Sequence, residues 1–331
     1  MRFGPVAPAD AAGAILAHSV TLPSGRLRKG RVLTDKDCAA LAATDLREVW
    51  VARPEAGDIA EDEAAALLAA ALAPDPAAAS LRIGAAATGR VNLHAAGAGV
   101  LTFEAAAVHA LNAIDPGITF AALAPVTRVA EGQLAGTVKI IPYAVPEAAL
   151  DAAARAAGGA GLRVRAAVIG RAVLIETELP GLAFNAKGAR AVRGRIEALG
   201  ARMDPVVRVL HRVDAIAAAI EASEADLVLI LTASATSDPR DVAPEAVRRA
   251  GGAIARFGIP VDPGNLLFVG THRGRSVVGL PGCARSPALN GADWVLDRVV
   301  TGLPCGDAEI AAMGVGGLLK ETPARGRPRE G

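Results

Sequence analysis

The hydrophobic pattern separates the chain into a regular second half and an irregular first half. The segment Leu227–Leu231 is apolar at every position, which is typical of a strand in a parallel sheet whose two faces are both covered. Around it, predicted strands lie at 163–169, 173–176, 203–210, 227–231, 266–269 and 276–280, and predicted helices at 186–199, 215–222, 244–250 and 287–300. Strands and helices that alternate at this spacing predict a three-layer, Rossmann-like α/β domain around a doubly wound, mostly parallel sheet.

The first half mixes short strands and helices in no regular order. Thr34 and Asp37 have the spacing of a capping box and predict that a helix begins there. The remaining predicted strands lie at 20–22, 49–51, 81–83 and 137–141, and the helices at 61–72, 104–114 and 146–157. Glycines at 158–161 mark a joint. We therefore expect a mixed α+β domain at 1–160, the doubly wound domain at 161–304 and a C-terminal tail at 305–331, disordered from 321.

Length, charge and cysteine content narrow the class of protein. A chain of 331 residues is long enough for two domains. Its 35 Lys and Arg residues are balanced by 34 Asp and Glu residues, so we expect no nucleic-acid partner. We expect no membrane span and no secretory signal, and hence a cytoplasmic protein. Three widely spaced cysteines, Cys38, Cys283 and Cys305, suit reduced thiols better than disulfides or a zinc site.

The turn after the strand 227–231 is the first candidate site, because ligands of such sheets bind beyond the carboxyl ends of the strands. Its candidate ligand-binding residues carry hydroxyl groups: Thr232, Ser234, Thr236 and Ser237. Small polar residues ahead of a helix suit an anion, and a nearby carboxylate, Asp238 or Asp241, could hold the Mg²⁺ that accompanies phosphate. A capped loop without a ligand is an equally good interpretation of the composition alone.

The turn after the strand 276–280 is the second candidate site. Gly282 permits close approach of the backbone to a ligand, while Arg285 and Ser286 could contact a phosphate or the edge of a pterin. The candidate binding residues of this turn are Gly279, Pro281, Gly282, Arg285 and Ser286. As an isolated pattern, Gly-x-Pro-Gly is more often only a tight turn.

Taken together, the two turns resemble a known family. The segments DLVLILTASATSDPRDVAPEAV and GRSVVGLPGCARSPALNGADWVLDRVVTGL are similar to the two motifs of the molybdopterin-binding domain family, in the same order and separation. The resemblance implies that Asp241 matches an aspartate implicated in nucleotide transfer through Mg²⁺ in adenylylating members. The Gly-Gly-Thr-Gly segment of the family is Ala-Ser-Ala-Thr at 233–236 here, which argues against adenylyl transfer because these residues resist φ > 0.

The resemblance leaves two main functional hypotheses. In the first, the protein is a transferase similar to the molybdopterin molybdenumtransferases, which activates the pterin phosphate with ATP and Mg²⁺ or uses the AMP-activated pterin to insert molybdate. In the second, it is a non-catalytic carrier that hands molybdopterin to a cytidylyltransferase or a molybdoenzyme chaperone. The loss of the glycine segment favours the second hypothesis. The whole chain also resembles the N-terminal part of two-part proteins that end in a molybdopterin cytidylyltransferase. We expect a homo-oligomer in either case. A third hypothesis, another phosphate ligand, requires both motif matches to be accidental.

Overall fold

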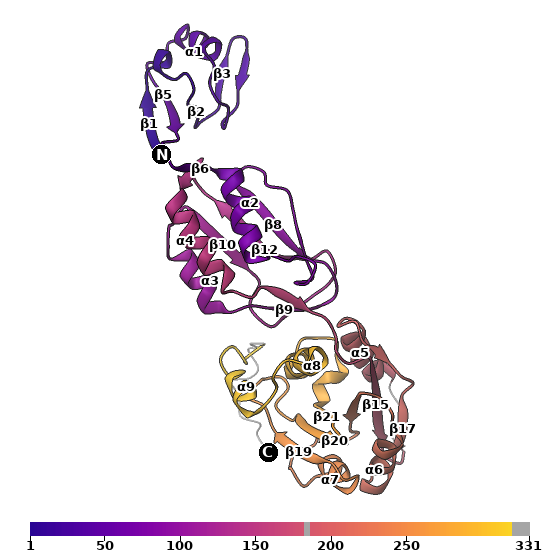
Figure 1. Ribbon diagram of the computed structural model, residues 1–331. Helices are drawn as coiled ribbons and strands as arrows, with labels where there is room; N and C mark the ends of the chain where they lie inside the picture. Colours follow the sequence, from indigo (N-terminus) through magenta and orange to yellow (C-terminus); the bar gives the residue numbers. More distant parts are fainter. Residues whose placement is uncertain (182–185, 320–331) are drawn as a thin grey trace, which may run out of the picture. The chain divides into compact units, whose positions relative to one another are not determined.

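The computed structural model describes residues 1–181 and 186–319, and the chain forms two compact units (Figure 1). Unit 1 consists of Met1–Gly97, Leu101–Pro125 and Glu131–Val164. Unit 2 contains the rest of the chain, including two short segments of the first half, Ala98–Val100 and Val126–Ala130. The division expected from the sequence, at residue 160, had placed both segments in the first domain.

The first 53 residues of unit 1 build a small β-rich core. A three-stranded antiparallel sheet has the order β1-β5-β2, next to the hairpin β3-β4. Thr34 caps α1 in a capping box with Asp37, as its spacing predicts. The elements are β1 (Arg2–Val6), η1 (Pro8–Asp10), β2 (Ile15–Leu16), β3 (Val20–Leu22), β4 (Gly25–Leu27), α1 (Asp35–Ala42) and β5 (Val49–Arg53).

The remainder of unit 1 is built around a four-stranded antiparallel sheet with the order β10-β12-β8-β7. The helices α2 and α3 pack against strands of this sheet, and α4 packs against both helices. The elements are β6 (Asp58–Ala60), α2 (Glu61–Leu72), β7 (Leu81–Ile83), β8 (Arg90–Ala95), β9 (Gly99–Thr102), α3 (Ala105–Asn112), β10 (Ile118–Ala122), β11 (Thr127–Val129), β12 (Leu134–Ile140), β13 (Ala144–Pro146), α4 (Glu147–Gly158) and β14 (Arg163–Arg165), of which β11 and parts of β9 and β14 belong to unit 2.

Unit 2 contains a seven-stranded sheet with the order β16-β15-β18-β21-β20-β19, in which β17 also pairs with β15. Strands β16, β17 and β18 run parallel to β15, and β21 runs parallel to β18. The strands are β15 (Arg171–Glu178), β16 (Arg202–Met203), β17 (Val207–Leu210), β18 (Leu227–Leu231), β19 (Ala253–Phe257), β20 (Phe268–His272) and β21 (Arg275–Leu280).

Helices cover both faces of this sheet, which explains why β18 is apolar at every position. Leu227, Leu229 and Leu231 pack in one core with α5 and α8, whereas Val228 and Ile230 pack in a second core with α6 and α7. In Figure 1, α5 and α8 lie on one side of the strands, and α6 and α7 lie on the other. The helices are α5 (Ala186–Glu197), α6 (Val213–Ala222), α7 (Val242–Arg249), η2 (Gly282–Arg285), α8 (Gly291–Thr301) and α9 (Asp307–Ala312).

Strand β20 is the exception to the parallel order, since it runs antiparallel to β19 and β21. A two-residue turn connects β20 to β21, and both of its residues, Arg273 and Gly274, have positive φ, which is the geometry of a tight hairpin. The hairpin places His272 and Arg273 at the amino end of β21, opposite the predicted turns.

The described part of the predicted C-terminal tail is folded. Helix α9 is part of unit 2, and Ile310 and Met313 are buried in the core that also contains α8. The expected disordered end, 321–331, lies outside the described residues. Within the described parts of the chain, no helix is both long and apolar enough to span a bilayer.

Candidate functional site

The two predicted turns begin side by side at one edge of the sheet of unit 2. Leu231, the last residue of β18, pairs with Leu280, the last residue of β21, and with Glu176 near the end of β15. Because the three strands are parallel, the segments that follow them emerge at the same edge. We call the residues from Thr232 to Asp241 the first turn and those from Pro281 to Asn290 the second turn.

The first turn is held mainly by hydrogen bonds between its own residues. The Thr232 hydroxyl donates to the carbonyl of Ser234 over 2.6 Å and lies 3.3 Å from the Thr236 hydroxyl, and both threonines are buried. Ser234 and Ser237 are exposed. Of the four hydroxyl residues expected to bind a ligand, two therefore stabilise the loop and two face solvent.

The segment Ala-Ser-Ala-Thr at 233–236 does not adopt the backbone that glycines would allow. The non-glycine residues with positive φ in the described chain are Ser80, Thr88, Val126 and Arg273, and none of them lies in this segment. The loss of glycine from the family motif is thus matched by a loop without left-handed residues.

Asp241 is the N-cap of α7. Its Oδ1 atom accepts from the backbone N–H of Val242 at 2.7 Å, and its Oδ2 atom accepts from the N–H of Ser237 at 3.1 Å. Both carboxylate oxygens therefore satisfy backbone donors, and Asp241 closes the first turn onto the helix. Among the described residues, no group of three or more His, Cys, Asp or Glu is placed to hold a metal ion.

The second turn contains both packing residues and exposed residues. A Cβ atom at Gly279 would lie 2.0 Å from the ring of Phe268, so glycine is required there by packing within the sheet. Pro281 is buried at the start of η2, whereas Gly282 has open space around its Cα and is exposed together with Ser286. Gly279 and Pro281 thus shape the turn, and Gly282 and Ser286 are on its surface.

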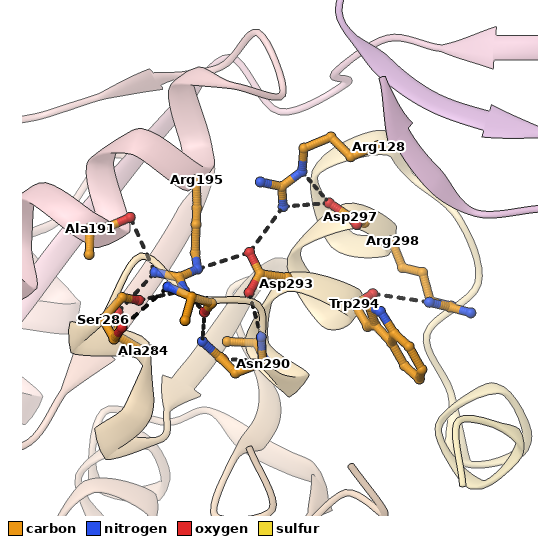
Figure 2. A network of polar contacts seen from close by, with 12 residues as sticks. Arg128, Ala191, Arg195, Ala284, Ser286, Asn290, Asp293, Trp294, Asp297 and Arg298 are labelled. Atoms are coloured by element: carbon orange, nitrogen blue, oxygen red, sulfur yellow. Dashed lines mark hydrogen bonds and ion pairs between the residues drawn. The ribbon is translucent and has the colours of Figure 1, made fainter. Parts of the chain in front are cut away.

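Arg195 of α5 determines the shape of the second turn, as Figure 2 shows. Its guanidinium is buried and donates to three backbone carbonyls of the turn, those of Ala284 at 2.9 Å, Ser286 at 2.7 Å and Ala288 at 2.9 Å. Its Nε atom donates to Asp293 over 2.9 Å. Asp293 also accepts from the backbone N–H of Asn290 in the capping box of α8. One buried arginine therefore fixes the turn and the start of the helix that follows it.

Arg128, in the short segment of the first half that belongs to unit 2, extends this network. Its Nη2 atom lies 2.5 Å from Asp297 and 3.7 Å from Asp293. Burial raises the pKa of Asp297 to about 6, and the attraction of Arg128 opposes that rise only in part. The contact joins residues 169 positions apart in the sequence.

Glu176, Thr177 and His211 lie at the same edge and were not among the residues predicted to form the site. Arg285 donates from Nη1 to Glu176 Oε1 at 3.0 Å and from Nη2 to the carbonyl of Thr232 at 2.8 Å, so it joins the second turn to the first. Thr177 accepts from the N–H of Ala233 at 2.8 Å and lies 3.0 Å from His211 Nδ1. The sequence contained one sign of this site: Glu176 places a carboxylate directly after four apolar residues of a strand, Ala172 to Ile175.

The segment at 258–267 also reaches this edge, because β20 runs in the opposite direction and Phe268 at its start pairs with Gly279. Asp262 in this segment donates its backbone N–H to Gly317 and accepts from the N–H of Leu319. The described end of the chain therefore lies against a loop next to the second turn.

An α/β domain whose polar turns follow parallel strands at one edge belongs to the class of domains that bind small molecules there. Residues 169–299 match the family described as "Probable molybdopterin binding domain". This part of the chain is therefore similar to the molybdopterin-binding domain family, as the two sequence motifs predict. Residues 5–53 match a "Domain of unknown function (DUF8806)".

Wider comparisons add little. No curated protein matches the chain. Among solved structures, one match is the crystal structure of a molybdopterin biosynthesis MoeA protein from Pyrococcus horikosii, with 12% sequence identity and a TM-score of 0.29, covering 92% of this chain and 74% of that one.

Proposed function

We propose that unit 2 binds molybdopterin at the edge formed by the first and second turns, and that the protein acts as a carrier of molybdopterin in cofactor assembly. One observation carries the proposal: within the segment that matches the molybdopterin-binding family, both motif turns begin at paired residues, Leu231 and Leu280. We interpret the sheet with helices on both faces as the three-layer, doubly wound arrangement, in which this edge is the usual place for a ligand.

The exposed parts of the two turns are the groups available to the pterin and its phosphate. The Ser234 and Ser237 side chains and the backbone around them precede α7, whose N-terminal end favours negative charge. Across the edge, Gly282 leaves room for backbone contact, and Arg285 and Ser286 supply polar groups. Thr232, Thr236, Gly279 and Pro281 would act indirectly, by holding these groups in place.

Carriage is favoured over adenylyl transfer or molybdate insertion for two reasons. Asp241, the residue proposed to hold Mg²⁺, has a structural role as the N-cap of α7 and accepts one backbone hydrogen bond at each oxygen. The segment at 233–236 also lacks both the glycines of the adenylylating motif and positive φ. A carrier needs a partner, and a cytidylyltransferase or a molybdoenzyme chaperone remains our proposal for it, as does assembly into a homo-oligomer.

Anaerobic titration of the full chain with molybdopterin, followed by incubation with ATP and Mg²⁺, tests this proposal. We expect saturable binding without release of AMP or pyrophosphate. Pterin-dependent turnover of ATP would instead support the transferase, and an absence of molybdopterin binding would refute both.

A further inference from the structure

Glu176 is a buried carboxylate at the proposed ligand edge with one oxygen unsatisfied. The residue is 4% exposed, and its Oε1 atom accepts from Arg285 at 3.0 Å. Its Oε2 atom is buried and, among the described residues, has no hydrogen-bond partner. Leaving a buried carboxylate oxygen without a donor is costly, so such an oxygen calls for a specific explanation.

Glu176 lies beside the first turn and is bonded to the second. It pairs in register with Leu231, the residue before the first turn, and Arg285 of the second turn bonds both Glu176 and the Thr232 carbonyl. Gly188 of α5 packs closely here, since a Cβ atom at Gly188 would lie 3.2 Å from Arg285 and 3.3 Å from Leu231. The Arg285 side chain is 34% exposed, so it extends from the buried carboxylate to the protein surface.

We propose that Glu176 is a specificity-determining residue whose Oε2 atom accepts an N–H of the ligand, and that this N–H belongs to the exocyclic 2-amino group of a pterin. The inference rests on the proposed function and deepens it. An ionised carboxylate can only accept hydrogen bonds, and the 2-amino group of a pterin is a donor, whereas an oxo group at that position is not. Arg285 holds the other oxygen and thereby orients the carboxylate.

A purely structural role is the competing explanation. In that case the Glu176–Arg285 pair would only join β15 to the two turns, and the identity of the group at position 2 of the pteridine would not affect binding. The two explanations differ in ligand selectivity, which a structural role does not change.

The experiment compares two probes on the full chain, 6-hydroxymethylpterin phosphate and the corresponding lumazine phosphate, in which an oxo group replaces the 2-amino group. We expect the wild-type protein to prefer the pterin by roughly tenfold to a hundredfold, because the lumazine presents an acceptor to a carboxylate acceptor. In Glu176→Gln the amide can still accept from Arg285 and can also donate to an oxo group. The preference should therefore fall to about threefold or less.

Glu178→Gln is the matched control, because Glu178 lies on the same strand but is exposed. It should keep the wild-type preference, and melting temperatures of all three proteins establish that they are folded. If Glu176→Gln does not fold, the wild-type protein alone decides the matter: the N2,N2-dimethyl derivative of the pterin probe, which has no N–H on the exocyclic amine, should bind at least about tenfold more weakly.

Equal binding of the pterin and lumazine probes by the wild-type protein, or an unchanged preference in a folded Glu176→Gln, would overturn the inference while leaving molybdopterin binding in place. Failure of the wild-type protein to bind molybdopterin itself would overturn the proposed function together with the inference.

Discussion

The first and second turns occupy the same edge of one sheet, yet they are held in place in different ways. The first turn is stabilised mostly over short distances, by the Thr232 hydroxyl and by Asp241, whose partners lie within four residues. The second turn takes its shape from Arg195, about 90 residues earlier in the chain. Apart from the bonds that Thr177 and Arg285 make to its first two residues, the first turn is therefore a local structure, whereas the second turn depends on the packing of the whole unit.

This difference predicts which substitutions affect only the site and which affect the domain. Losing a local cap costs about 1 kcal/mol, whereas removing one partner of a buried ion pair costs about 3–5 kcal/mol. The predictions below test that contrast, from the largest expected effect to the smallest.

Arg195→Met should have the largest effect. It leaves Asp293 and three carbonyls without their buried donor, so we expect the free energy of unfolding to fall by about 3–5 kcal/mol in denaturant titrations. Arg193→Met is the matched control on the same helix, since the Arg193–Glu197 pair is exposed and should contribute less than about 1 kcal/mol. Similar losses in both variants would contradict the special role of Arg195.

The ion pair between Arg128 and Asp297 should also make stability depend on pH. Burial raises the pKa of Asp297 in the folded protein to about 6, above its usual value of 3.8. Its contribution to stability is therefore fully present below pH 4 and is lost as the pH rises through 6, by at most about 3 kcal/mol. Urea titrations give the free energy of unfolding of the wild type and of Asp297→Asn at each pH between 4 and 7. The free energy of the wild type should fall more steeply with rising pH than that of Asp297→Asn. If the two free energies change with pH in parallel, Asp297 makes no such contribution.

Gly279→Ala should destabilise the start of the second turn through packing. The added Cβ would overlap the Phe268 ring, so we expect a loss of about 1–3 kcal/mol in thermal or denaturant unfolding. Gly282→Ala is the control, because no atom lies within 4 Å of its added Cβ. If the two alanine variants were equally stable, the packing role of Gly279 would be wrong.

Asp241→Ala should have the smallest effect on stability, about 1 kcal/mol, as expected for loss of an N-cap. Asp241→Asn should be nearly neutral, because asparagine is an equally good cap, and it should bind molybdopterin as the wild type does. Melting temperatures and titrations of both variants check this. Loss of Mg²⁺-dependent turnover in a stable Asp241→Asn protein would instead restore the catalytic role.

The same contrast explains how far the sequence could predict the structure. The helix Glu61–Leu72 and the strand Leu227–Leu231 agree with the predicted ranges, because their patterns are local. Strand β19 was missed, and the predicted strand at 203–210 is broken at Asp204–Val206, which contains Pro205. Proline cannot donate to a strand ladder, and that break could have been anticipated.

For the candidate site, the sequence predicted the two turns and their common edge, but not what holds them. The contacts of Arg195 with the second turn and of Arg128 with Asp297 join residues far apart in sequence, and no local pattern announces them. The composition of the first turn suggested that its hydroxyl groups bind a ligand. The structure shows that two of them, those of Thr232 and Thr236, make hydrogen bonds within the loop.

Molybdopterin binding at the edge shared by the two turns is tested most directly by hydrogen–deuterium exchange. The full chain is compared with and without molybdopterin under anaerobic conditions. We expect saturable protection of amides in the segments 232–241 and 281–290, with little change at the Arg273–Gly274 hairpin on the opposite edge. Saturable binding that protects the hairpin or unit 1 and leaves both turns unprotected would contradict it.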